Sequence, residues 1–326
     1  MNVEPFYLSK RSVDPAIGAQ FTQLNLFCLY LTGVKLQFSH LTAGRPYQRL
    51  YHRNERRGAI LSMGKKITIE VLREATERFI EAEPGRLGNE GWWQRPLVVT
   101  ASIDQRFDQL PDIAYHKHLY PRDLLPTARS VVVFFIPFKK ELVKENRKGN
   151  RPCRNWGLAY VQTNDLIGRL TSALGDLLGE HGFKSGLTPA THNFDEVALM
   201  ARWSHKHLGY LAGLGRFGVH RMLITPAGCT GRFGSLVTEA ELGNHPLIET
   251  EEACLLKAGQ ECGKCIEACP VQALKEDDFD RRRCWDRLNE NQRSLSYFSD
   301  LPETTHVCAK CAAIMPCSFK NPVAEL

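Results

Sequence analysis

No stretch of this 326-residue sequence reaches the roughly 20 consecutive apolar residues that a membrane-spanning helix needs. The longest apolar run, residues 24–38, is interrupted by Asn25 and Lys35. Lys10 and Arg11 precede this run, as they would in a secretory signal, but no clear small-residue cleavage site follows it. The sequence therefore predicts no membrane association, and it favours the cytoplasm over export.

Net charge is small over most of the chain. Of the formal charge of +6, a share of +5 belongs to residues 1–62, which hold eight Lys and Arg against three acidic residues. The remaining 264 residues carry only +1. This balance does not support a large nucleic-acid footprint, which requires a basic surface.

Cysteines are numerous and crowded. Eight of the eleven fall between Cys254 and Cys317, whereas disulfide frameworks belong mainly to small secreted chains. Crowding of this kind favours metal or cluster ligation in a reducing compartment. For the other three, Cys28, Cys153 and Cys229, ordinary free thiols are the default interpretation.

The run CGKCIEACP fits the last three positions of the bacterial four-iron motif C-x2-C-x2-C-x3-C-P with Cys262, Cys265 and Cys269. The first position holds Gly259. Cys254 lies eight residues before Cys262, so a loop can return its thiolate to the same cluster. In two-cluster proteins the last cysteine of the motif ligates the other cluster.

A second set of cysteines follows, with Met315 standing where the C-x3-C spacing expects cysteine. Applying the crossover rule, we expect two four-iron (4Fe-4S) clusters: one ligated by Cys254, Cys262, Cys265 and Cys317, the other by Cys269, Cys284, Cys308 and Cys311. The alternative is a pair of tetrahedral zinc sites, which also use C-x2-C pairs. Two clusters of about −2 each would shift the charge of residues 63–326 from +1 to roughly −3.

Hydrophobic patterning divides the chain into three parts: an extension outside the fold (1–62), an α/β domain (63–250) and a cysteine-rich domain (251–326). We interpret the extension as upstream sequence from a misplaced start codon, which mass spectrometry of the native N-terminus would test. Expected helices are one beginning near Ile67 and one over 164–183; expected strands are 96–102, 130–138, 218–225 and 234–242.

The run GLGRFG at 213–218 matches the dinucleotide-binding pattern G-x-G-x-x-G, with Glu239 about twenty residues later. That function requires a strand before the first glycine and a helix after the last. Here a helical pattern precedes the glycines and a strand pattern follows them. We therefore expect tight turns that allow a flat cofactor, or another backbone, to come close.

The runs LAGLGRFGVHRMLIT and GCTGRFGSLVTEAEL, followed by the cysteines, resemble the epoxyqueuosine reductase family and the related reductive dehalogenases. The similarity is greatest to epoxyqueuosine reductase-like iron–sulfur proteins, which share a stretch like NFDEVALMARWSHKH, and it covers Met63 to about Ser318. The resemblance implies a nitroreductase-like α/β (α+β) domain that binds a corrinoid such as cobalamin. A ferredoxin-like domain with two 4Fe-4S clusters follows it.

By the same resemblance, Gly213, Gly215 and Gly218 form the turn beneath the cofactor. The family's proton-donating aspartate falls at Leu199, and the nearest acid is Asp195. Two rival donors, His207 and Tyr210, follow on the same expected helix. The competing interpretations are a helix N-cap for Asp195 and a solvated helix face for His205 and His207.

Together these features predict an oxidoreductase that takes electrons from a low-potential donor of the ferredoxin or flavodoxin type. A corrinoid or another cofactor would pass them to a small molecule or a modified nucleoside, and transfer RNA is a possible substrate that the charge does not support. The basic run 137–156 either lines a substrate mouth or is a solvated loop. Alternatives are an electron carrier without its own substrate, and a zinc-bearing regulatory protein.

Overall fold

The computed structural model describes residues 66–88, 90–191, 193–313 and 315–325. The chain divides into two units, Met1–Asn54 and Glu55–Leu326, and all described residues lie in the second. The predicted extension over 1–62 and the thiol of Cys28 lie outside the described residues.

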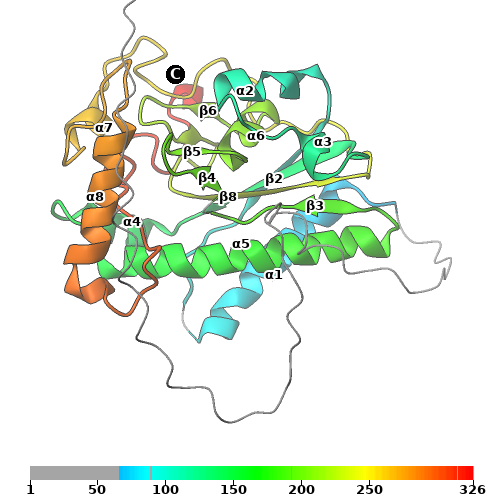
Figure 1. Cartoon of the computed structure of the whole chain (residues 1–326), viewed down its shortest axis with the longest axis horizontal. Helices are drawn as coiled ribbons and strands as arrows, with labels where there is room; N and C mark the ends of the chain where they lie inside the picture. The colour runs from blue at the N-terminus through cyan, green and yellow to red at the C-terminus, as the bar shows by residue number, and fades with distance from the viewer. Residues whose placement is uncertain (1–65, 89, 192, 314, 326) are drawn as a thin grey trace, which may run out of the picture. The chain divides into compact units, whose positions relative to one another are not determined.

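One four-stranded sheet, in the order β1-β2-β8-β3, organises the fold (Figure 1). Its strands are β1 (Leu97–Ser102), β2 (Ser130–Pro137), β8 (Gly231–Thr238) and β3 (Ser185–Leu187), and each neighbouring pair is antiparallel. The expected strands 96–102 and 130–138 are confirmed as β1 and β2. The expected strand 234–242 begins and ends earlier, as β8.

The expected strand 218–225 is wrong over most of its length. Only β7 (Leu223–Ile224) is a strand there, and it pairs with β6 (Arg216–Phe217). Between them the chain turns tightly, because the Gly218 amide donates to the Met222 carbonyl at 3.0 Å and Arg221 adopts a φ of 62°. The apolar residues of 218–225 therefore reflect the packing of this turn, and they do not form one long paired strand.

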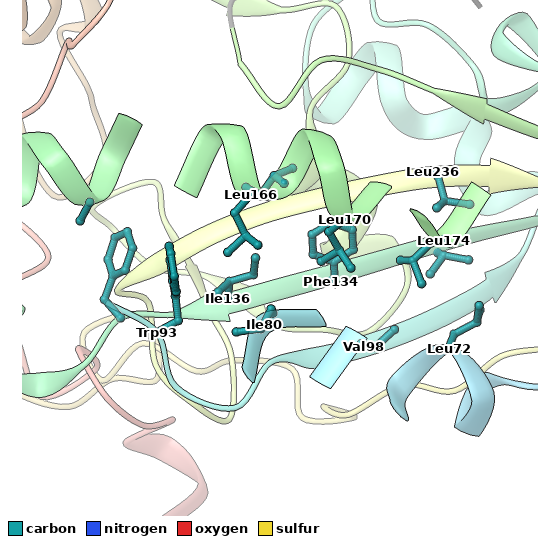
Figure 2. Close-up of a cluster of buried hydrophobic side chains, with 14 of the residues drawn as sticks. Leu72, Ile80, Trp93, Val98, Phe134, Ile136, Leu166, Leu170, Leu174 and Leu236 are labelled. Carbon is teal, nitrogen blue, oxygen red and sulfur yellow. The ribbon is translucent and has the colours of Figure 1, made fainter. Parts of the chain in front are cut away.

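Helices α1 (Ile69–Leu87) and α5 (Arg154–Glu180) cover one face of the sheet (Figure 1). Leu166, Leu170 and Leu174 recur every four residues along α5 and are buried against the sheet (Figure 2). The helix expected over 164–183 begins ten residues earlier and ends at Glu180; Gly182 then has a φ of 83°.

The other face is covered by shorter elements: η1 (Gln105–Gln109), α2 (Leu110–Ile113), α3 (Pro121–Leu124) and α6 (His205–Leu211). With apolar cores on both faces, all eight residues of β2 are buried. The mixture of helices and strands agrees with the expected class. The antiparallel sheet makes the arrangement α+β, although helix–strand alternation alone is typical of parallel sheets.

Residues 251–326 are mainly loops around α7 (Lys264–Glu267), α8 (Arg281–Ser294), η2 (Ser296–Phe298) and η3 (Val323–Glu325). Phe298 is 1% exposed and belongs to the same core as α1, α5 and the sheet. A Cβ added at Gly157 of α5 would lie 2.7 Å from the Phe298 ring, so glycine permits this close packing. The domain boundary near residue 250 stays a prediction.

The basic run 137–156 is neither wholly a solvated loop nor a free substrate mouth. It forms α4 (Lys140–Arg147) and the start of α5. Arg151 pairs with Glu290 of α8 at 2.6 Å, and Arg154 pairs with Asp300 at 2.6 Å. Two of its seven cations thus join the body to the cysteine-rich part of the chain. Among the described helices, none has the length and apolar character to cross a bilayer.

Candidate functional site

Four cysteines, Cys254, Cys262, Cys265 and Cys317, line one small cavity together with Val219 and His220. The loop after Cys254 makes this possible, since the Ala258 amide donates to the Cys254 carbonyl at 2.9 Å. Gly259 has a φ of 78°, a conformation that favours glycine. Gly259 stands where the four-iron motif has its first cysteine. It therefore lies in a turn that brings Cys254 back to the other three cysteines.

The remaining four cysteines are near neighbours of one another, judged by their mutual electrostatic effects. Burial, followed by repulsion from Cys308 and Cys269, raises the pKa of Cys284 to about 12. Burial also raises the pKa of Cys311, and Cys308, Cys284, Cys269 and Cys265 add to the effect. Cys311 also packs against the buried cluster that contains Cys254, Cys265 and Cys317, so the two thiol groups are neighbours.

A backbone amide and a lysine ammonium next to this second group of cysteines favour the negatively charged thiolate form. The Ala273 amide donates to the Cys269 Sγ at 3.2 Å. The ammonium of Lys310, 3% exposed, lies near Cys308 and donates to the Lys148 carbonyl at 2.9 Å. An amide donor and a buried cation both stabilise thiolates.

The ten described cysteines are all free thiols. Burial and the neighbouring thiolates Cys317, Cys254 and Cys262 raise the pKa of Cys265 to about 11, so that without a metal its proton is retained at neutral pH. A metal ion or cluster that binds these sulfurs displaces their protons, and its positive charge offsets the repulsion between the thiolates. Two sets of four soft thiolate donors fit two four-iron clusters, and they also fit zinc.

Two further residues beside the first group were missed by sequence reasoning. The donor atoms of His220, Cys229 and Cys317 all lie within 4.8 Å of one another, and all three residues are buried. Cys229 lies 25 residues before Cys254 and fits no spacing of the four-iron motif, so the sequence did not indicate that it lies beside these cysteines. The fold brings it there, because its amide donates to the Cys317 carbonyl at 2.9 Å.

Asp195 lies in a small hairpin of β4 (Phe194–Asp195) and β5 (Met200–Ala201). Its Oδ1 accepts from the amides of Val197 at 3.0 Å and Ala198 at 2.9 Å. The helix N-cap interpretation is therefore wrong, because Asp195 caps a hairpin turn. Leu199, the position of the family's donor, is in that turn at a φ of 54°.

The Asp195 carboxylate is stabilised in its charged form. The Tyr115 hydroxyl donates to its Oδ2 at 3.0 Å. The Ala198 amide is the main cause that lowers the pKa of Asp195, and the Tyr115 hydroxyl is the next. A carboxylate with a lowered pKa is a hydrogen-bond acceptor at neutral pH, not a ready proton donor.

His207 and Tyr210 both lie on α6, as expected, and both contact the Phe217 ring, with centroid distances of 4.7 and 5.7 Å. The His207 Nδ1 is 2.7 Å from the Ser204 Oγ. Burial lowers the pKa of His207 to about 3, and the Lys206 charge adds to the effect. The structure thus brings His207 and Tyr210 together, whereas Asp195 sits on a separate hairpin.

The solvated-face interpretation is wrong for His205. This residue is 8% exposed, and its Nδ1 lies 2.8 Å from the Ser235 Oγ of β8. Burial lowers its pKa to about 4. His205 therefore anchors α6 to the sheet as a neutral core residue.

Lys206, between these histidines, links α6 to the second thiol group. Burial lowers its pKa to about 8, the nearby Arg281 adds to this effect, and Cys311 opposes it. Its ammonium donates to the Arg221 carbonyl at 2.9 Å. A lysine with this pKa can exchange a proton near neutral pH, and sequence reasoning missed it because its apolar surroundings come from distant segments.

The glycine turn is filled by protein atoms. A Cβ at Gly213 would lie 2.4 Å from the Pro246 Cβ, and one at Gly215 would lie 2.4 Å from the Ile224 carbonyl oxygen. A Cβ at Gly218 would lie 2.7 Å from the His220 Cε1. These glycines permit close approach of the chain to itself, one of the two interpretations made from the sequence. Their place beneath a cofactor stays a prediction.

No protein-family model matches this chain, and no curated protein matches it. Among solved structures, an epoxyqueuosine reductase from Bacillus subtilis is 18% identical, with a TM-score of 0.45 over 76% of this chain and 66% of that one. An epoxyqueuosine reductase bound to an epoxyqueuosine-modified tRNA-Tyr stem loop gives 18% and 0.44 over the same shares. The catabolic reductive dehalogenase NpRdhA, in complex with 3-bromo-4-hydroxybenzoic acid, is 13% identical, with a TM-score of 0.47 over 70% of this chain and 30% of that one.

This chain spans slightly less than two thirds of the length of those reductases. Epoxyqueuosine reductases and a reductive dehalogenase, the families that the sequence motifs resemble, are thus among the solved proteins to which this chain is similar.

Proposed function

We propose that this protein is an iron–sulfur oxidoreductase that holds two four-iron clusters and uses their electrons to reduce a substrate bound beside α6. One observation carries the proposal: four cysteines from distant positions line a single cavity, and Cys311 of the other four packs against the same buried cluster. The ligand sets are those expected from the motif, Cys254, Cys262, Cys265 and Cys317, then Cys269, Cys284, Cys308 and Cys311. When bound, the clusters supply single electrons at low potential.

The protein's own residues supply position and protons. Cys311 packs against the buried cluster that contains Cys265, and Lys206 lies on α6. There, Lys206 and Tyr210 are the candidate proton donors, since Tyr210 is 37% exposed and Lys206 has a lowered pKa. His207 is neutral at pH 7 and orients Ser204, while Asp195 stays charged and accepts hydrogen bonds.

The substrate we propose is a small molecule or a modified nucleoside, and the electron donor is of the ferredoxin or flavodoxin type in the cytoplasm. A transfer-RNA substrate has the precedent of the reductase solved with a tRNA stem loop, but the small net charge of residues 63–326 offers it little support.

An electron carrier without its own substrate is the second candidate. It is favoured by the sheet, whose two faces are both filled by apolar cores, and by the closed glycine turn. Anaerobic reconstitution with cobalamin separates the two candidates. A stoichiometric base-off cobalamin spectrum supports an enzyme with a cofactor site outside the turn, whereas clusters alone, with no reduction of any modified nucleoside, support the carrier.

The cluster assignment is tested on protein purified and reconstituted anaerobically. We expect about eight iron atoms and eight sulfides per chain, which follow from two four-iron clusters. Cys265→Ala should lose about half of that iron, and Cys153→Ala, which removes a thiol outside both groups, should lose none. About two zinc atoms per chain without iron would identify the zinc alternative and overturn the proposal.

A further inference from the structure

His220 is held in one orientation beside Cys317 by the turn that carries it. The ring is 5% exposed, and its Nε2 lies 3.3 Å from the Cys317 Sγ. A side chain at Gly218 would collide with the ring, because a Cβ there would lie 2.7 Å from the His220 Cε1. The last glycine of GLGRFG therefore makes room for this imidazole.

Hydrogen bonding determines which ring nitrogen carries the proton. The Met222 amide, which can only donate, lies 3.1 Å from the His220 Nδ1. Nδ1 must therefore accept, so the proton of the neutral ring is on Nε2. The Nε2–H group then points at the Cys317 sulfur and donates to it.

Cys229 places a second polar group beside the same sulfur. Its side chain is fully buried, and its sulfur lies within 4.8 Å of the Cys317 sulfur. The backbones of the two segments are joined, since Cys229 N donates to the Cys317 carbonyl at 2.9 Å and the Thr230 Oγ1 donates to the Ser318 carbonyl at 2.7 Å. These bonds hold the two backbone segments side by side.

We propose that His220 and Cys229 are positioning residues whose Nε2–H and S–H groups donate to the Cys317 sulfur and thereby raise the reduction potential of the cluster it ligates. Hydrogen bonds to a cluster sulfur stabilise the more negative, reduced form. In the second thiol group the corresponding bond comes from a backbone amide, Ala273 N. This inference rests on the proposed two-cluster function.

The experiment is a potentiometric titration, followed by electron paramagnetic resonance, of reconstituted wild type and of His220→Leu, His220→Gln, Cys229→Ala and Cys229→Ser. We expect His220→Leu and Cys229→Ala to keep about eight iron atoms per chain. In each, one cluster should become harder to reduce by on the order of tenfold, or ~59 mV for one electron. His220→Gln and Cys229→Ser, which retain a donor, should restore most of the shift, and Cys153→Ala should show none.

Two results would overturn the inference. Unchanged potentials at full iron content would show that the donors do not tune the cluster. Loss of about half the iron in both Cys229→Ala and Cys229→Ser would make Cys229 a ligand instead of a donor. Wild type that takes up no iron would refute the proposed function itself, which is a distinct result.

Discussion

At the scale of single residues, the folded environment decides which of the candidate groups are charged. Asp195, His205 and His207 all have lowered pKa values, but for different reasons: hydrogen bonds at Asp195, and burial at the two histidines. The hydrogen bonds stabilise the charged carboxylate of Asp195, whereas burial opposes the charged form of the two histidines. Residue type alone therefore does not assign a role near α6.

Tyr115→Phe should raise the pKa of Asp195 towards its ordinary value, because it removes the bond from the Tyr115 hydroxyl to Oδ2. The amide bonds from Val197 and Ala198 remain, so the shift should be partial. The measurement is a carboxyl-carbon NMR titration of Asp195. The exposed Tyr120→Phe serves as control, and a titration curve unchanged from wild type in Tyr115→Phe would disprove the contact.

His205 should make the protein sensitive to mild acid. Its pKa is lowered to about 4 in the folded state, so between pH 6.5 and 4 the unfolded chain binds more protons, and stability falls as pH falls. This one residue should cost roughly 2 kcal/mol of unfolding free energy between pH 7 and 4.5. Unfolding free energies measured at both pH values should differ less in His205→Gln than in wild type. The exposed His116→Gln should match wild type.

At the scale of elements, α4 is the support for the loop that carries Cys308. Asn146 on α4 is fully buried; its Nδ2 donates to the Cys308 carbonyl at 2.9 Å, and its Oδ1 accepts from the Cys153 amide at 3.0 Å. Lys310 donates to the Asn146 and Lys148 carbonyls from the same loop. The basic run 137–156 was expected to lie at the surface. Its helix α4 instead supports the loop that carries Cys308.

Asn146→Ala should destabilise the protein by about 2–4 kcal/mol, because it leaves two buried backbone groups without partners. It should also lower the retention of iron, since the Cys308 loop loses its anchor. Chemical denaturation and iron analysis after dialysis against a chelator measure the two effects. Lys144→Ala, an exposed change on the same helix, should be nearly neutral; equal effects of the two variants would contradict this account.

At the scale of the whole molecule, the cysteine-rich part and the sheet share one apolar core. Phe298, Val307 and Ala313 pack in the same cluster as Leu72, Leu170 and Leu236 (Figure 2 shows the sheet side). Burial of this kind couples the two regions in folding. We therefore expect the regions on either side of residue 250 to unfold together, and the boundary there stays a prediction.

Phe298→Ala should destabilise the protein by about 3–5 kcal/mol through the cavity it leaves in this core. Because the core is shared, near-ultraviolet circular dichroism of the body and visible absorption of the clusters should still change in a single coincident thermal transition. The 86% exposed Val197→Ala is the control. Two separate transitions in wild type would show that residues 251–326 fold independently.

Much of the fold was predictable from local patterns. Apolar periodicity was enough to locate β1, β2 and α5. Their β-branched residues and leucines are buried in the core, as the periodicity predicts. The 218–225 segment was not predictable in this way. Its apolar residues pack within a turn whose positive φ at Arg221 depends on distant contacts.

The spacing of the cysteines was enough to predict two groups of thiols, because the motif and the crossover rule depend only on the length of chain between cysteines. The surroundings of those thiols follow from the folded chain instead. His220 and Cys229 reach Cys317 through a turn and a strand far from the cysteine motif, Asn146 supports Cys308 from another helix, and the glycine turn closes on Pro246. Hydrogen bonds, burial and charge act across space, so residues 80 or more positions away in the sequence lie beside a motif that local sequence identifies.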